Sequence, residues 1–223
     1  MATGACGRCC DTARGSWSIG KRCIGRSGSS AGWCINARAR RVLAGGGCGV
    51  VPSRVTSGGP MDVTHIPCGR DGWGHLTAVI DCHDREIVGD EFALRGRAKE
   101  AERALESACL ARFGTFRPNE ATPIFRSANG LIFQSRRFRR ACGEYRLQQE
   151  FITPYTPEQN GLIERFFRSL KEECVWQYHF AGFEDARQAV ATWMQWYNDG
   201  QPHQALHYRS PRQYRREQAA RVA

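Results

Sequence analysis

The chain has 223 residues, of which 41% are hydrophobic, and this is enough for one buried core or two small ones. It contains no run of 18 apolar residues and no signal-peptide pattern, so neither membrane insertion nor secretion is expected. The formal net charge is +10, but residues 1–60 hold nine Lys and Arg against one acid, which leaves a net charge of +2 for the remainder. The excess of basic residues is therefore weak support for nucleic-acid binding beyond residue 60.

Residues 1–60 are the least patterned part of the sequence. They hold six of the eleven cysteines and 13 of the 24 glycines, without sustained alternation or a helical period. We expect a disordered or non-native leader, with the folded unit beginning near Met61; a basic arm that follows a phosphate backbone is the alternative. Cys6 and Cys9 form a CxxC pair with no second pair at a finger-like distance, and the first histidine is His65, which argues against a zinc site.

Hydrophobic patterning begins abruptly after the leader. Three β-rich segments predict an antiparallel meander, at residues 61–67, 73–82 and 86–93. Helical and strand patterns then alternate, with helices at 98–113 and 136–143 and strands at 122–127 and 146–152. Because a helix leads into the fourth strand, that strand is expected to run parallel to the first. This α/β arrangement of three antiparallel and two parallel strands flanked by helices is the ribonuclease-H-like mixed sheet.

The C-terminal third of the chain predicts two helices after a turn-rich, mobile loop at 153–161. The first helix has a core-facing stripe at helical spacing, formed by Ile163, Phe166, Phe167, Leu170 and Cys174. An adjoining face holds Glu164, Arg168 and Lys171. The last helix covers about 183–198, and its aromatic residues are expected in the core, namely Trp193, Trp196 and Tyr197. We set the folded core at 61–215 and a polar tail at 216–223.

Several motifs occur in order at characteristic separations between residues 61 and 215. They include Met61-Asp62-Val63-Thr64, Ser127-Ala128-Asn129-Gly130, Gln159-Asn160-Gly161-Leu162-Ile163-Glu164 and Trp196-Tyr197-Asn198. These motifs closely resemble the second-frame product of two-frame insertion sequences, a transposase with a retroviral-integrase-type (DDE) catalytic core. In that family an Asp, Asp, Glu triad has 35 residues between its last two members, and 35 residues separate Ala128 from Glu164 here. The second aspartate position is therefore vacant in this chain.

The resemblance implies cleavage and transfer of DNA strands at insertion-sequence ends with Mg²⁺ or Mn²⁺. Phosphodiester attack uses divalent ions that stabilise the attacking and leaving oxygens, and such ions prefer carboxylate ligands. The implied catalytic and metal-binding residues are Asp62 and Glu164, with weakened metal binding because position 128 is Ala128. The implied partners are DNA (element ends and target), a helix-turn-helix protein from the upstream frame, and further copies of the chain on DNA, in a bacterial-type cytoplasm at the nucleoid.

Four residues are candidates for nucleic-acid contact: Tyr155, Asn160, Arg168 and Lys171. Tyr155 could stack on a splayed base or anchor its loop, and Arg168 and Lys171 could contact phosphates or form a solvated face. Asp81 could replace the missing carboxylate, if the hairpin sets it opposite Asp62, or it could brace the adjacent turn.

Three interpretations of activity follow from Ala128. Loss of a group that acts as part of a catalytic unit commonly costs several powers of ten in rate, so a strongly impaired strand transferase is expected. The alternatives are a catalytically inactive DNA-binding or assembly module that inhibits transposition, and the product of a decaying pseudogene.

Overall fold

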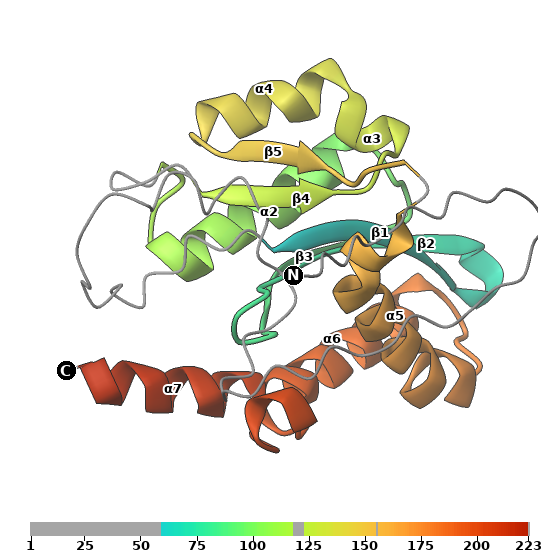
Figure 1. Cartoon of the computed structure of the whole chain (residues 1–223). Helices are drawn as coiled ribbons and strands as arrows, with labels where there is room; N and C mark the ends of the chain where they lie inside the picture. The colour runs from blue at the N-terminus through green and yellow to red at the C-terminus, as the bar shows by residue number, and fades with distance from the viewer. Residues whose placement is uncertain (1–58, 118–122, 155, 223) are drawn as a thin grey trace, which may run out of the picture. The chain divides into compact units, whose positions relative to one another are not determined.

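A mixed five-stranded sheet lies at the centre of the fold (Figure 1). Its strands, in the spatial order β3-β2-β1-β4-β5, are β1 (Pro60–Pro67), β2 (Trp73–Ile80), β3 (Ile87–Ala93), β4 (Ile124–Ser127) and β5 (Gln148–Phe151). The first three strands pair antiparallel, whereas β4 pairs parallel with β1 and β5 pairs parallel with β4. The predicted mixed sheet is confirmed.

This computed structural model describes residues 59–117, 123–154 and 156–222, all within one unit of the chain, Asn36–Ala223. The predictions for the leader and its cysteines, and those for Tyr155, lie outside the described residues. Among the described residues, no helix combines the length and the apolar character that crossing a membrane requires.

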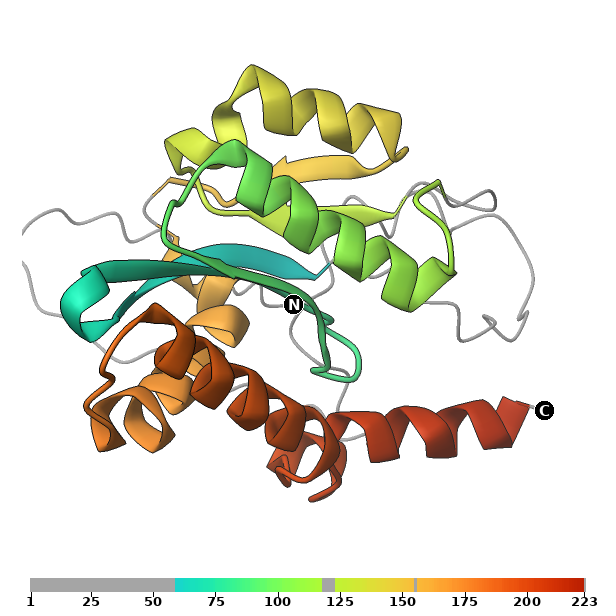
Figure 2. The ribbon, with the colours of Figure 1, turned by 180° about the vertical axis from the view of Figure 1, so that it is seen from behind.

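Helices cover both faces of the sheet (Figures 1 and 2). They are α2 (Ala98–Phe113), α3 (Leu131–Gln134), α4 (Arg136–Glu144), α5 (Gly161–Glu173), α6 (Phe183–Asp199) and α7 (Pro211–Val222). One apolar cluster joins the sheet to α2, α3 and α4, and a second joins it to α5 and α6. The sheet is therefore the middle layer of three.

The alternation of side chains along β1 decides which layer each residue faces. Met61 and Val63 contact the cluster with α2, while Ile66 contacts the cluster with α5 and α6. Because successive side chains of a strand point to opposite faces, Asp62 shares the face of Ile66. The first carboxylate therefore lies on the side of the sheet that α5 covers.

The predicted stripe of α5 is confirmed, since all five of its members are buried. In α6, Trp193 and Tyr197 are buried as expected, but Trp196 is 47% exposed, so its placement in the core is wrong. In the helical period, position 196 lies at the edge of the apolar stripe that contains Trp193, so the Trp196 side chain meets solvent.

The C-terminal residues, for which we expect a polar tail, are helical. A helix, α7, begins at Pro211 and crosses the boundary that we set at 215/216. It lacks an apolar stripe, which is why its sequence gives no helical signal. Its anchor is electrostatic: Arg212 and Arg215 donate 3.0 Å hydrogen bonds to the buried carboxylate of Glu86, in the turn between β2 and β3.

Candidate active site

Asp62 lies near the start of β1 and is half-buried. Its Oδ1 accepts a 2.8 Å hydrogen bond from the backbone nitrogen of Val63, and its Oδ2 accepts one of 3.1 Å from Nδ2 of Asn160. Burial raises the pKa of the Asp62 carboxyl, the negative charge of Glu164 raises it further, and the two hydrogen bonds act in the opposite direction. The ionised carboxylate would therefore gain from a nearby cation.

Position 128 lies directly beside Asp62. Strands β1 and β4 pair in parallel with Met61 opposite Ser127, so the next residues along, Asp62 and Ala128, are neighbours. The Ala128 backbone nitrogen donates a 3.4 Å hydrogen bond to the carbonyl oxygen of Met61. The Ala128 methyl packs against the apolar cluster that includes α2, α3 and α4, on the face of the sheet opposite to Asp62, so the two residues are neighbours through their backbones. Ala128 thus follows the carboxyl end of β4 and lies beside Asp62.

Glu164 lies in the first turn of α5 and is exposed. Its charge acts on the Asp62 carboxyl, so the two acids are electrostatic neighbours although they come from different elements. The amino end of a helix favours a negative charge because of the helix dipole. Asp62 is therefore the neighbour of Ala128 through the strand pairing and of Glu164 through electrostatics, with two acidic groups among the three.

Asn160 connects the turn before α5 to Asp62. It is 1% exposed, and its amide contacts Asp62, while its predicted contact with DNA stays a prediction. Asn160 is the N-cap residue of α5 but makes no side-chain capping hydrogen bond. Asparagine is a preferred N-cap because its side chain can bond the first helical nitrogens. In this chain the Asn160 side chain donates to the Asp62 carboxylate instead.

The turn that holds Asn160, η2 (Pro157–Asn160), is tied to the sheet through Gln159. Nη1 of Arg126, on β4, donates a 3.3 Å hydrogen bond to the Gln159 carbonyl oxygen. The Gln159 side chain accepts a 2.9 Å bond from the backbone nitrogen of Thr153 and donates one of 3.1 Å to the hydroxyl of Thr153. These bonds fix the approach of α5 to β1. Neither the sequence spacing nor the residue types indicate them.

The two basic candidates on α5 have different surroundings. Nε of Arg168 lies 2.7 Å from a carboxylate oxygen of Glu172, and the Arg168 side chain is 76% exposed. Lys171 is half-buried. DNA contact by either residue stays a prediction.

Asp81 is not opposite Asp62. The antiparallel register pairs Asp62 with Ala78, so the expected placement of Asp81 is wrong by three residues. Asp81 is 5% exposed, accepts a 2.8 Å hydrogen bond from the His83 nitrogen, and lies 3.1 Å from Nε of Arg112. Asp81 stabilises the β2–β3 turn through these contacts. It therefore does not replace the carboxylate that position 128 lacks.

The donors at this site suit one hard divalent cation. Asp62 and Glu164 offer carboxylate oxygens, and Oδ1 of Asn160 is buried without a hydrogen-bond partner among the described residues. Mg²⁺ is commonly held by one or two carboxylates, with water and substrate phosphates completing its shell. Across the described ranges, no group of three or more His, Cys, Asp or Glu could hold a metal ion.

Two family models, both described as "Integrase core domain", match residues 57–157 and 145–211. The transposase for insertion sequence element IS904 of Lactococcus lactis is 27% identical over 73% of this chain and 61% of that protein. The putative transposase InsK for insertion sequence element IS150 of Escherichia coli is 26% identical over 63% of this chain and 48% of that protein. The matched part of the chain thus spans about half to two thirds of these relatives.

Solved structures show the same architecture. The simian T-cell lymphotropic virus intasome, in complex with PP2A regulatory subunit B56 gamma, aligns with a TM-score of 0.57 and 20% identity, over 71% of this chain and 54% of that chain. The HTLV-2 integrase catalytic core domain in complex with magnesium aligns with a TM-score of 0.53 and 16% identity, over 71% of this chain and 95% of that chain. These likenesses confirm the ribonuclease-H-like fold. Together the two family models cover residues 57–211, so the chain belongs to the integrase core domain family, and it is similar to insertion-sequence transposases.

Proposed function

We propose that this chain is the catalytic-core part of a transposase that acts on the DNA ends of its insertion sequence, and that Ala128 strongly impairs its strand cleavage and transfer. The observation that supports the proposal is that Asp62 neighbours position 128 in the paired strands and Glu164 at the start of α5. A shared acidic site at the carboxyl end of β4 is what metal-assisted phosphoryl transfer requires.

Asp62 and Glu164 are the residues that would hold Mg²⁺ or Mn²⁺, which when bound supplies charge stabilisation to the reacting phosphate. Asn160 orients the Asp62 carboxylate through its amide hydrogen. The amino end of α5 adds its dipole, which favours negative charge, at the same place. Each of these contributions is present in this chain, and the carboxylate expected at position 128 is the one that is missing.

A catalytically inactive DNA-binding or assembly module is the second candidate. Two observations favour it: the Ala128 methyl packs on an apolar cluster, and the alternative acid Asp81 is held by Arg112. Such a module could occupy element ends or join a multimer and block it. The proposed partners are the same in both cases, namely DNA, further copies of the chain and a helix-turn-helix protein from the upstream frame, in the cytoplasm at the nucleoid.

A strand-transfer assay separates the two candidates. The substrate is labelled duplex DNA that carries the terminal sequences of the element, with Mn²⁺ or Mg²⁺ and the upstream-frame protein present. The chain as given, Ala128→Asp and the neutral isostere Ala128→Asn are compared. We expect activity in Ala128→Asp alone. Robust metal-dependent cleavage by the unchanged chain would refute the impairment, and DNA binding without cleavage in all three variants would favour the inactive module.

A further inference from the structure

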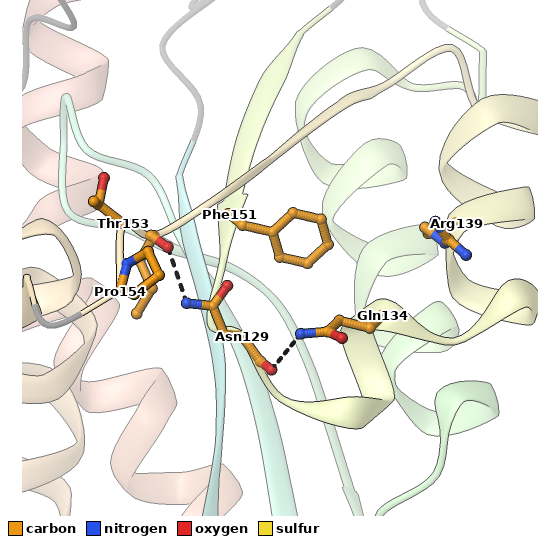
Figure 3. A pocket seen from close by; sticks show the side chains of 7 residues that line it. Asn129, Gln134, Arg139, Phe151, Thr153 and Pro154 are labelled. Carbon is orange, nitrogen blue, oxygen red and sulfur yellow. Dashed lines mark hydrogen bonds between the residues drawn. The ribbon is translucent and has the colours of Figure 1, made fainter.

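A pocket of about 510 Å³ opens beside position 128, at the carboxyl ends of β4 and β5 (Figure 3). It is lined by Asn129, Gln134, Arg139, Phe151, Ile152, Thr153 and Pro154. Its volume lies within the range of about 300–1,000 Å³ that is usual for small-ligand sites. Six of its seven lining residues are exposed, so the pocket is open to solvent. An open pocket suits one unit of a polymer, because the rest of the polymer can continue outside it.

Phe151 gives the pocket an aromatic surface. It is the last residue of β5, the edge strand of the sheet, and is 40% exposed. Figure 3 shows its ring projecting between Asn129 and Arg139. An exposed aromatic ring in a polar pocket is a platform on which a nucleobase can stack, whatever the base.

Two amide side chains form the polar floor and are held in fixed positions. Nδ2 of Asn129 donates a 2.9 Å hydrogen bond to the carbonyl oxygen of Ile152, and Nε2 of Gln134 donates one of 2.8 Å to the carbonyl oxygen of Asn129. These bonds use the nitrogen of each amide and leave its oxygen as an acceptor. Amide oxygens accept hydrogen bonds from the exocyclic amino groups of bases.

Arg139 supplies an unpaired positive charge. It is exposed and makes no ion pair or side-chain hydrogen bond among the described residues. Its neighbour on α4, Arg140, is also exposed, but Nε of Arg140 lies 2.8 Å from a carboxylate oxygen of Glu144. A guanidinium without an acidic partner at the rim of an aromatic pocket is suited to a phosphate.

The pocket is joined to the acidic site by covalent and hydrogen-bonded links. Asn129 directly follows Ala128 in the chain, and Thr153 is bonded to Gln159, the residue before Asn160. A DNA strand whose phosphate lies at Asp62 would therefore pass close to the pocket.

We propose that this pocket binds one unstacked nucleotide of the DNA at the acidic site: its base lies on Phe151, its polar edge meets Asn129 and Gln134, and its phosphate meets Arg139. The inference rests on the proposed function, because it takes DNA as the ligand. It goes further in assigning single-stranded DNA next to the reacting phosphate to a defined subsite.

The test measures the affinity of the full chain, without metal, for a fluorescent duplex that ends in a three-nucleotide single-stranded overhang. A matched duplex carries three abasic residues in the overhang, which removes the bases and keeps the phosphates. The unchanged chain should prefer the overhang with bases by roughly 5- to 100-fold in Kd. Phe151→Ala should remove this preference, and Phe151→Trp should keep it.

Two control variants are matched by position and exposure. Phe113→Ala removes a ring that is 36% exposed at the end of α2, and it should leave the preference for bases unchanged. Arg139→Ala should reduce the dependence of log Kd on log salt by about 0.7 for one single-strand phosphate, whereas Arg140→Ala should leave it unchanged.

Each outcome decides one question. Equal behaviour of Phe151→Ala and Phe113→Ala would overturn the pocket while leaving DNA binding in place. A preference for bases that depends on Phe151, together with no strand transfer by Ala128→Asp, would support the pocket and overturn the proposed activity. No binding to either duplex would overturn both proposals, provided that the unfolding transitions of the variants match that of the unchanged chain.

Discussion

Asn160 donates a hydrogen bond of 3.1 Å from its side-chain amide to Oδ2 of Asp62, across 98 positions of sequence. This bond joins the turn before α5 to β1. Its donor residue is buried, since Asn160 is 1% exposed. A buried polar contact of this kind fixes the orientation of the carboxylate before any ligand arrives. The geometry of the acidic site therefore depends on a residue that carries no charge.

Replacement of Asn160 should separate its contribution to stability from its contribution to metal binding. Asn160→Ala removes the hydrogen bond and also an amide oxygen that has no partner among the described residues, so we expect a loss of only about 1 kcal/mol in unfolding free energy. Metal affinity should fall by about 10-fold, because an orienting partner of a ligand is lost. Calorimetric titration with Mn²⁺ and urea unfolding measure the two effects.

The matched control for Asn160→Ala is Gln159→Ala. It removes two hydrogen bonds to Thr153 in the same turn but no contact with Asp62. A loss of Mn²⁺ affinity as large in Gln159→Ala as in Asn160→Ala would mean that the turn as a whole, and not the amide, sets the carboxylate.

Ala128→Asp should make stability depend on divalent metal. It would add a carboxylate to the strand position beside Asp62, whose pKa is already raised by burial and by the charge of Glu164. Without metal we expect a loss of about 1–2 kcal/mol, since each pKa unit of like-charge repulsion is worth about 1.4 kcal/mol. At a free metal concentration of 100 times Kd, metal binding to the folded chain should add about 2.7 kcal/mol to the unfolding free energy. Thermal unfolding with and without Mg²⁺ measures both, and Ala128→Asn should show neither change.

Much of the geometry of the acidic site could be predicted from the sequence because it follows from alternation and spacing. The strand pattern places Asp62 on one face of β1, and the helical period places Glu164 beside the buried stripe of α5. Position 128 follows from the parallel pairing of β4 with β1. The amide of Asn160 could not be predicted in the same way, because an asparagine before a helix usually caps that helix.

Two features of the fold depend on partners that are distant in sequence. The helix α7 has no apolar stripe and is held by Arg212 and Arg215 on Glu86, which no local pattern indicates. The register that pairs Asp62 with Ala78 is decided by the hairpin geometry, and it selects the second of the two alternatives for Asp81, which stabilises the adjacent turn.

Glu86→Gln should destabilise the fold in a pH-dependent manner. Burial opposes ionisation of Glu86, but the guanidinium groups of Arg112, Arg212 and Arg215 outweigh it and hold the pKa of the carboxyl below its ordinary value of 4.5. A lowered folded-state pKa adds stability above pH 4.5, and that stability is lost as the pH falls through the folded-state pKa. We expect a loss of about 3 kcal/mol at pH 7, because a buried charge network loses its acid.

Urea unfolding across the pH range tests the sign of this effect. The difference between the unchanged chain and Glu86→Gln should be constant above about pH 5.5 and should shrink below pH 4.5. The control is Glu184→Gln, which breaks an exposed ion pair with Arg187 on α6 and should leave stability unchanged within error. A difference that grows as the pH falls would contradict the assignment.

Gly89→Ala should loosen the contact between β3 and α2. A Cβ at position 89 would overlap the Ala104 carbonyl oxygen and would lie 2.6 Å from the Ala108 nitrogen. Backbone atoms of a helix cannot move aside as a flexible side chain can, so the helix must shift, at a cost of about 2–3 kcal/mol. The matched control is Gly143→Ala on α4, where a Cβ meets nothing within 4 Å and should add about 0.5–1 kcal/mol of stability. Equal unfolding midpoints for the two variants would show that α2 is not seated on β3 as closely as Gly89 requires.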